Sequence, residues 1–175
     1  MFYTFVPSEP TTSPMKSSEL SLYVIAKFYD TGDLITNKKL QKLIYYIEAW
    51  SLVYTNSIVD EDFEAWIHGP VIRNLYQEYK SFGSSPISIQ IDSSSKLIKG
   101  FAAKHSLSSD QVELIDNVLA AYGSLSSFQL ETLSHSEAPW LQAREGYGMF
   151  DNCSVTISKE LMKEFYSSQV HGKEK

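Results

Sequence analysis

The chain has 175 residues, of which 43% are hydrophobic, 13% aromatic and 21% charged, and its formal net charge is −6. This length suits a single domain, and the eleven tyrosines, nine phenylalanines and three tryptophans exclude a chain that is disordered throughout. The acidic balance disfavours general binding to nucleic acid, which depends on clustered lysine and arginine.

The composition also limits the compartment and the kinds of site. Cys153 is the only cysteine, so no intrachain disulfide can form and a cysteine-based zinc site lacks ligands. No stretch approaches the roughly 20 apolar residues that cross a bilayer. Residues 1–15 contain three prolines and no basic residue, unlike a secretory signal. We therefore expect a cytoplasmic protein without membrane contact.

Proline content and apolar periodicity divide the chain into three segments. Residues 1–16 hold half of the six prolines and are expected to be extended or mobile. A single helical domain is expected over 17–168, followed by a polar tail over 169–175. No internal repeat of fixed period is visible.

Two amphipathic patterns open the domain. Apolar residues at i, i+3, i+4 and i+7 predict a helix over 18–30 that ends before Gly32. Thr36 is a suitable N-cap for the longest helix, whose apolar stripe is expected to lie at the centre of the core. That stripe consists of Leu40, Leu43, Ile44, Ile47, Trp50 and Tyr54.

The middle of the chain combines a turn, a helix and a strand pattern. Gly69 can take a positive φ and Pro70 suits the first position of a helix, which predicts a helix over 71–80. Isoleucines alternate with polar residues over 87–91, a pattern typical of a half-buried strand. We therefore expect a minor β element near 87–91.

Two helix starts in the second half carry a capping box, in which a serine N-cap and a glutamine three residues later satisfy each other's backbone amides. They predict helices over about 109–122 and 127–135, and a last helix is expected to begin at Ser158. The fold class is therefore mainly α, a compact domain of about six helices with one minor β element. The two boxes pair Ser108 with Gln111 and Ser126 with Gln129.

Residue types that serve catalysis and metal binding are present without the patterns that those functions need. Cys153, His135 and Asp151 could supply a nucleophile, a base and an orienting group, but no local motif surrounds the thiol, and a structural cysteine is favoured. His68, His135 and the acids at 60–64 lack the i, i+4 spacing of a helical zinc pair. The glycines form no phosphate-binding loop. We predict no enzyme, no cofactor and no metal.

The two helices at 109–135 have the outline of a helix-turn-helix motif. The second of them contains no lysine or arginine, so it is poorly suited to contact phosphates or guanine. An ordinary helix hairpin is therefore favoured, and nucleic acid is not expected as a partner. A DNA-binding repressor stays as an alternative.

Three blocks of sequence, taken together, indicate a family. They are Asn-Lys-Lys-Leu-Gln-Lys-Leu-Ile-Tyr-Tyr from Asn37 with Trp50, Glu-Ala-Trp-Ile-His-Gly-Pro-Val from Glu64 with Leu75 and Tyr76, and Leu-Ser-His from Leu133 with Pro139 and Trp140. In order and spacing, over roughly residues 18–145, they resemble the Panacea domain of SocA-like antitoxins.

The resemblance implies a non-enzymatic, mainly helical antitoxin that neutralises a cognate protein toxin by direct contact. Such proteins are commonly encoded beside their toxin and often carried on prophages, and in at least one branch the antitoxin also delivers its toxin to the ClpXP protease. Because members pair with very different toxins, the identity of the toxin does not transfer. A prophage-derived adaptor or host-interaction protein without a toxin is the main alternative.

Within the matching blocks we separate residues of the scaffold from residues that face a partner. The scaffold set is Leu40, Leu43, Trp50, Gly69, Pro70 and Trp140. The partner set lies off the apolar stripe or consists of aromatic residues that commonly form interfaces. This second set is Lys39, Gln41, Lys42, Tyr45, Trp66 and His68. Residues 1–16 and the segment after Gly146 lie outside the blocks and are candidates for partner specificity.

Overall fold

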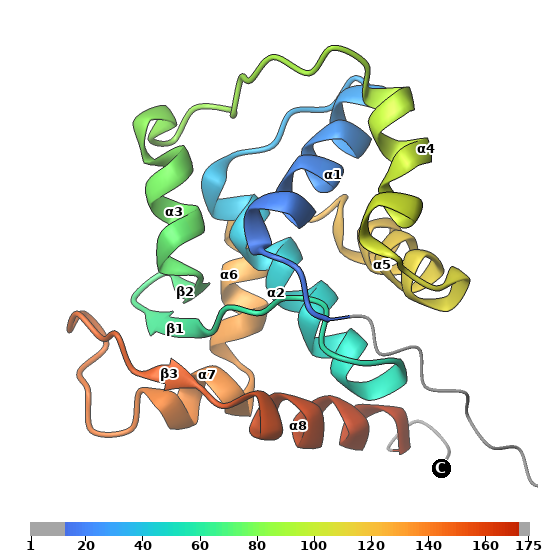
Figure 1. Ribbon diagram of the computed structural model, residues 1–175. Coiled ribbons are helices and arrows are strands. Elements are labelled where there is room, and N and C mark those ends of the chain that lie inside the picture. Colours follow the sequence, from blue (N-terminus) through green and yellow to red (C-terminus); the bar gives the residue numbers. More distant parts are fainter. Residues whose placement is uncertain (1–12, 172–175) are drawn as a thin grey trace, which may run out of the picture.

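The computed structural model describes residues 13–171 (Figure 1). This part of the chain contains eight α-helices and one sheet of three strands. The elements in chain order are α1 (Ser17–Asp30), α2 (Asn37–Tyr54), β1 (Phe63–Trp66), β2 (Gly69–Val71), α3 (Arg73–Tyr79) with a 3-10 turn (Lys80–Phe82), α4 (Ser94–His105), α5 (Ser109–Tyr122), α6 (Ser127–His135), α7 (Ala138–Ala143), β3 (Thr156–Ile157) and α8 (Lys159–His171).

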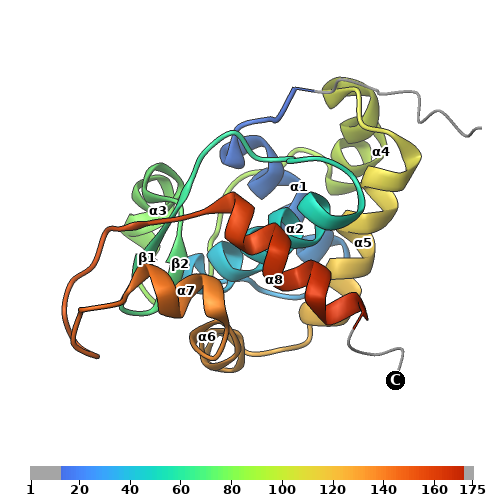
Figure 2. The same cartoon turned by 90° about the horizontal axis from the view of Figure 1, so that it is seen from below.

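Helix α2 lies at the centre and the other elements surround it. It packs against α1, α3, α5, α6, α8 and β2, and the view from below shows α8 crossing in front of it (Figure 2). Every residue from 40 to 49 is buried. The predicted N-cap is confirmed, since Thr36 Oγ1 accepts a hydrogen bond from the amide of Lys39 at 3.3 Å.

The polar side chains of α2 are buried together with the apolar ones. Glu48 is fully buried and accepts hydrogen bonds from the amides of Ile58 and Val59, both at 2.9 Å. Its other carboxylate oxygen lies 3.0 Å from the ammonium of Lys159 at the start of α8. A buried carboxylate is tolerated only when it is paired in this way, so Glu48 holds a loop and a helix against α2.

The sheet is antiparallel with the order β2-β1-β3. Its hairpin pairs Ala65 with Pro70 and Trp66 with Gly69. The prediction that Pro70 opens a helix is therefore wrong, and α3 begins only at Arg73. Pro70 is tolerated in β2 because β2 is an edge strand, where the missing amide costs no ladder hydrogen bond on the open side.

No strand forms over 87–91, although the two faces of this segment follow the predicted alternation. Ile87 is buried, whereas Ser88 and Gln90 are exposed. The backbone bonds to a loop and a side chain instead of a sheet: the amide of Ile87 donates to the carbonyl of Ile35 at 2.8 Å, and the hydroxyl of Tyr29 donates to the carbonyl of Ile87 at 2.9 Å. The mainly α class is confirmed, and the minor β element lies elsewhere.

The helices with strong local signals begin where the sequence predicts. Both capping boxes are present, and α5 and α6 have the predicted bounds. Ser158 precedes α8, and its hydroxyl accepts from the amide of Leu161 at 3.1 Å. The two helices beyond the predicted six are α4 and the short α7. The N-cap of α4 is Ser93, whose hydroxyl accepts from the amide of Lys96, and the helix buries only Phe101.

The ends of the described chain pack against the body. Met15 is buried, its amide donates to the carbonyl of Ile58 at 2.7 Å, and its carbonyl accepts from the amide of Asp60 at 3.0 Å. The remainder of the segment predicted as extended, residues 1–12, lies outside the described residues. Of the predicted tail, residues 169–171 belong to α8 and residues 172–175 lie outside.

Among residues 13–171, no helix combines the length and apolar character needed to cross a bilayer.

The central position of α2 predicts the cost of a cavity there. Leu43 has no exposed surface, so Leu43→Ala is expected to lower the free energy of unfolding by about 2–5 kcal/mol. Leu34, which is 66% exposed, provides the control, and Leu34→Ala is expected to change it by less than about 0.5 kcal/mol. Urea denaturation measures both, and equal effects would contradict the central placement of α2.

Candidate protein-interaction site

The first two sequence blocks meet at the β1–β2 hairpin. Side chains from the start of α2 satisfy backbone groups of the hairpin and of the segment after it. The ammonium of Lys42 donates to the carbonyl of Pro70 at 2.9 Å, and the amide oxygen of Gln41 accepts from the amide of Ile72 at 2.9 Å. The polar residues of α2 thus bind the chain reversal directly.

Gly69 is required at this reversal for two reasons. Its φ is +96°, a value that residues with a side chain rarely adopt. A Cβ atom there would also lie 2.6 Å from Cε of Lys42 and 2.9 Å from Oγ of Ser134. Any larger residue would therefore strain the backbone and have to displace the side chains of Lys42 and Ser134.

The third block holds the hairpin from the side of α7. The indole nitrogen of Trp140 donates to the carbonyl of Trp66 at 2.9 Å, and the ring of His135 stacks on Trp140 with centroids 3.9 Å apart. One helical turn further on, Arg144 is buried and donates to the carbonyls of Ala65 at 2.9 Å and Asp151 at 2.8 Å. The hairpin is thus bound on both sides.

Three residues predicted to face a partner are buried. Gln41, Lys42 and Tyr45 have exposed fractions of 1%, 1% and 0%. The ring of Tyr45 packs edge-on against Phe63 and Tyr166. This prediction is corrected: the middle of α2, residues 40–49, is enclosed on all sides, so positions there that lie off the apolar stripe contact neighbouring segments instead of solvent.

The other three predicted partner residues reach the surface. Lys39 is half-buried, and its ammonium donates to the carbonyl of Gly123 at 2.6 Å. Trp66 is half-buried and packs edge-on against Tyr76, and His68 is exposed. Trp66 and His68 share the hairpin, whereas Lys39 lies beside the α5–α6 turn, and none of the contacts in the described chain joins it to the other two.

The predicted scaffold residues lie inside the molecule to different degrees. Leu40 and Leu43 have no exposed surface, and Trp140 is 8% exposed. Trp50 is only half-buried and packs against the edge of the core. One part of Trp50 therefore packs against the core, and another part is accessible to solvent.

An ion pair between Glu64 of β1 and Arg73 of α3 borders the hairpin. The carboxylate of Glu64 accepts from the guanidinium of Arg73 at 2.6 and 2.8 Å. Partial burial by itself would raise the pKa of Glu64, but the hydrogen bonds from Arg73 and Trp66 and the charge of Arg73 lower it. The net effect is a lowered pKa, which favours the charged carboxylate beside the half-buried ring of Trp66.

Glu131 and Arg144 are site residues that sequence reasoning missed. Glu131 in α6 forms ion pairs with Lys38 and with His68, whose Nδ1 lies 3.0 Å away. Burial acts to raise the pKa of Glu131, whereas Lys38 and His68 lower it. Nothing local indicates this role. For Arg144 the i, i+4 spacing from Trp140 was a usable signal, because it puts both side chains on one helix face.

The catalytic and metal candidates are not brought together. Cys153 is buried with its sulfur 3.8 Å from the carbonyl of Ala143, whereas the ring of His135 stacks on Trp140, and no hydrogen bond among the described residues joins Cys153 to His135. Within the described chain, no three His, Cys, Asp or Glu side chains gather where they could hold a metal ion. Helices α5 and α6 follow each other as predicted, but they do not pack together as a hairpin: α5 packs against α2, and α6 packs against α2 and β2.

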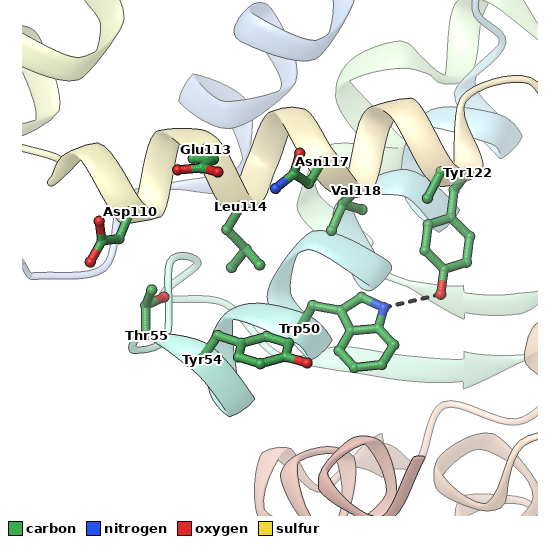
Figure 3. A pocket seen from close by; sticks show the side chains of 10 residues that line it. Trp50, Tyr54, Thr55, Asp110, Glu113, Leu114, Asn117, Val118 and Tyr122 are labelled. Atoms are coloured by element: carbon green, nitrogen blue, oxygen red, sulfur yellow. Dashed lines mark hydrogen bonds between the residues drawn. The ribbon is translucent and has the colours of Figure 1, made fainter. Parts of the chain in front are cut away.

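A groove of about 590 Å³ lies between the last turn of α2 and helix α5 (Figure 3). Trp50 and Tyr54 form its floor, and Asp110, Leu114 and further residues of α5 form its wall. The indole nitrogen of Trp50 donates to the hydroxyl of Tyr122 at 3.0 Å, which closes one end of the groove (Figure 3).

These features define a mainly α domain in which polar motif residues join one central helix to a small β-hairpin. Residues 40–141 match the family described as antitoxin SocA-like, Panacea domain. The match covers more than half of the chain, so the chain belongs to this family. Neither a curated protein nor a solved structure shows significant similarity to it.

Burial of Lys42 predicts a dependence of stability on pH. Burial lowers the pKa of this amine to about 7, against opposition from the charge of Glu131. Between pH 7 and the ~10.4 of an unfolded lysine, the unfolded chain binds a proton that the folded chain does not, so stability rises with pH. Lys42→Met is expected to flatten this rise between pH 7 and 9, measured by urea denaturation. Lys99→Met, on the exposed side of α4, should leave the slope unchanged.

Glu137 predicts the opposite slope at lower pH. Burial raises its pKa to about 7, although hydrogen bonds from Tyr166 and Tyr46 act against this. Between about pH 4.5 and 7 the folded chain holds a proton that an unfolded glutamate has lost, so its contribution to stability falls as pH rises. Glu137→Gln keeps an oxygen that can accept from Tyr166 and should remove this fall relative to the wild type. If Glu145→Gln, an exposed control, had the same effect, the assignment would be wrong.

Proposed function

We propose that the protein is the antitoxin of a toxin–antitoxin pair and neutralises its toxin by direct contact. The observation that carries the proposal is the match of residues 40–141 to the SocA-like antitoxin family. The proposal places the protein in the cytoplasm, beside a toxin encoded by a neighbouring gene, and prophage carriage would agree with it.

Neutralisation by occlusion needs a surface of ordinary size and no catalysis. About 800 Å² per partner is enough for a stable complex. The hairpin supports such a contact because hydrogen bonds from α2 and α7 hold its backbone, and a surface that is already ordered loses little entropy on binding. We propose Trp66 and His68 as contact residues there, with Lys39 as a third.

Growth and toxin lifetime test the proposal together. Expression of the neighbouring toxin alone should stop growth, and co-expression of this chain should restore it and yield a complex that co-purifies. Under occlusion the half-life of the toxin stays unchanged. A half-life shortened only in the presence of this chain and a ClpXP-type protease would add the role of adaptor. Absence of both rescue and association would refute the proposal.

His68 offers a substitution with little effect on the fold. Its side chain is 66% exposed and contacts only Glu131 among the described ion pairs. His68→Ala is expected to weaken toxin binding about tenfold, within the range of interface substitutions, while the thermal midpoint moves by no more than about 2 °C. Titration calorimetry and thermal melts measure the two effects. Lys99→Ala on α4 serves as the control, and equal affinities of the two variants would remove His68 from the contact.

A further inference from the structure

We propose that the groove between α2 and α5 is the docking site for a segment of the toxin that carries an apolar side chain flanked by lysine or arginine. The inference rests on the proposed antitoxin function and assigns a second surface to it.

The floor of the groove is aromatic. Within α2 only Tyr54 is exposed, to 59%, and its ring stacks on Trp50 with centroids 6.0 Å apart. Because the indole nitrogen of Trp50 already has its partner in Tyr122, docking would cover the apolar part of the ring without leaving a polar atom unpaired. Tryptophan and tyrosine in such positions commonly supply most of the binding energy of an interface.

The charge of the groove has one sign. Asp110 and Glu113 are the charged residues of its lining, both are exposed, and neither forms an ion pair within residues 13–171. Their i, i+3 spacing puts them on neighbouring positions of the α5 surface. Asp116, further along α5, is by contrast paired with Lys27 at 2.9 Å. Two carboxylates without a cationic partner among the described residues, beside an aromatic floor, complement a basic, apolar segment.

Other occupants fit this chemistry less well. Residues 1–12 contain aromatic side chains but no lysine or arginine, and residues 172–175 contain two lysines but no apolar side chain. A second copy carries the same net charge of −6 and would be repelled, as would the phosphates of a nucleic acid. A toxin segment can supply both the apolar and the basic groups.

The test uses the full chain and the protein encoded by the neighbouring reading frame. Two groove variants separate the two contributions: Asp110→Asn with Glu113→Gln removes the charges, and Tyr54→Ala removes part of the floor. Each has a matched control elsewhere, Asp92→Asn with Glu164→Gln for the charge and Phe128→Ala for an exposed ring. Phe128 is 73% exposed, and Asp92 and Glu164 are exposed as well.

We expect each groove variant to bind the toxin at least about tenfold more weakly and each control to stay within about twofold of the wild type. The charge variant should also lose most of the salt dependence of binding. Thermal midpoints verify the fold, and analytical ultracentrifugation of the free chain detects self-association.

The outcomes separate the two proposals. If the wild type binds the toxin and both groove variants bind it equally well, the groove assignment is overturned and the antitoxin function stands. If the free chain forms a dimer that Tyr54→Ala abolishes, a second copy occupies the groove and the assignment is overturned too. If the wild type neither binds the toxin nor restores growth, the proposed function itself fails.

Discussion

The enclosure of α2 is the constraint on which the rest of the structure depends. A helix buried over ten consecutive residues must satisfy each polar group that it carries. Glu48 accepts from the amides of Ile58 and Val59, and Lys42 donates to the carbonyl of Pro70. These bonds position a loop and a hairpin that have little regular structure of their own. In this core, hydrogen bonds from charged side chains therefore fix the position of backbone segments that have little regular secondary structure.

Because α2 is enclosed, the motif residues buried on it stabilise the fold, and other residues form the surface that a partner can contact. Gln41 and Lys42 lie inside, and the surface over them consists of the hairpin turn with Trp66 and His68. At its other end, α2 reaches solvent only in its last turn, where Tyr54 lies beside α5. Both regions are presented by elements that the core holds in place. This arrangement suits recognition of another protein, because little order has to be created when the surfaces meet.

Sequence reasoning succeeded where an element is specified by its own residues. The capping boxes at Ser108 and Ser126 each depend on atoms within four positions of the chain, and the structure contains both. It failed where the decisive partner is remote. Over 87–91 the alternation of faces is correct, yet the backbone bonds to Ile35 and Tyr29 and not to a strand. Gln41 and Lys42 lie off the apolar stripe of α2, which indicates solvent for a surface helix, and that inference fails once other elements cover every side.

The sequence by itself determined the starts of α2, α5, α6 and α8, the left-handed conformation of Gly69, the mainly α class and the family, since these depend on local backbone preferences and on short ordered blocks. Only the tertiary structure decided that Lys42 and Glu48 are internal, that Arg144 binds the hairpin, and that Trp50 and Asp110 line one groove. The physical reason is that burial and pairing depend on which surfaces meet. Elements far apart in the chain pack together because they bury apolar surface jointly. The amount buried depends on all of these elements, so it cannot be inferred from one stretch of residues.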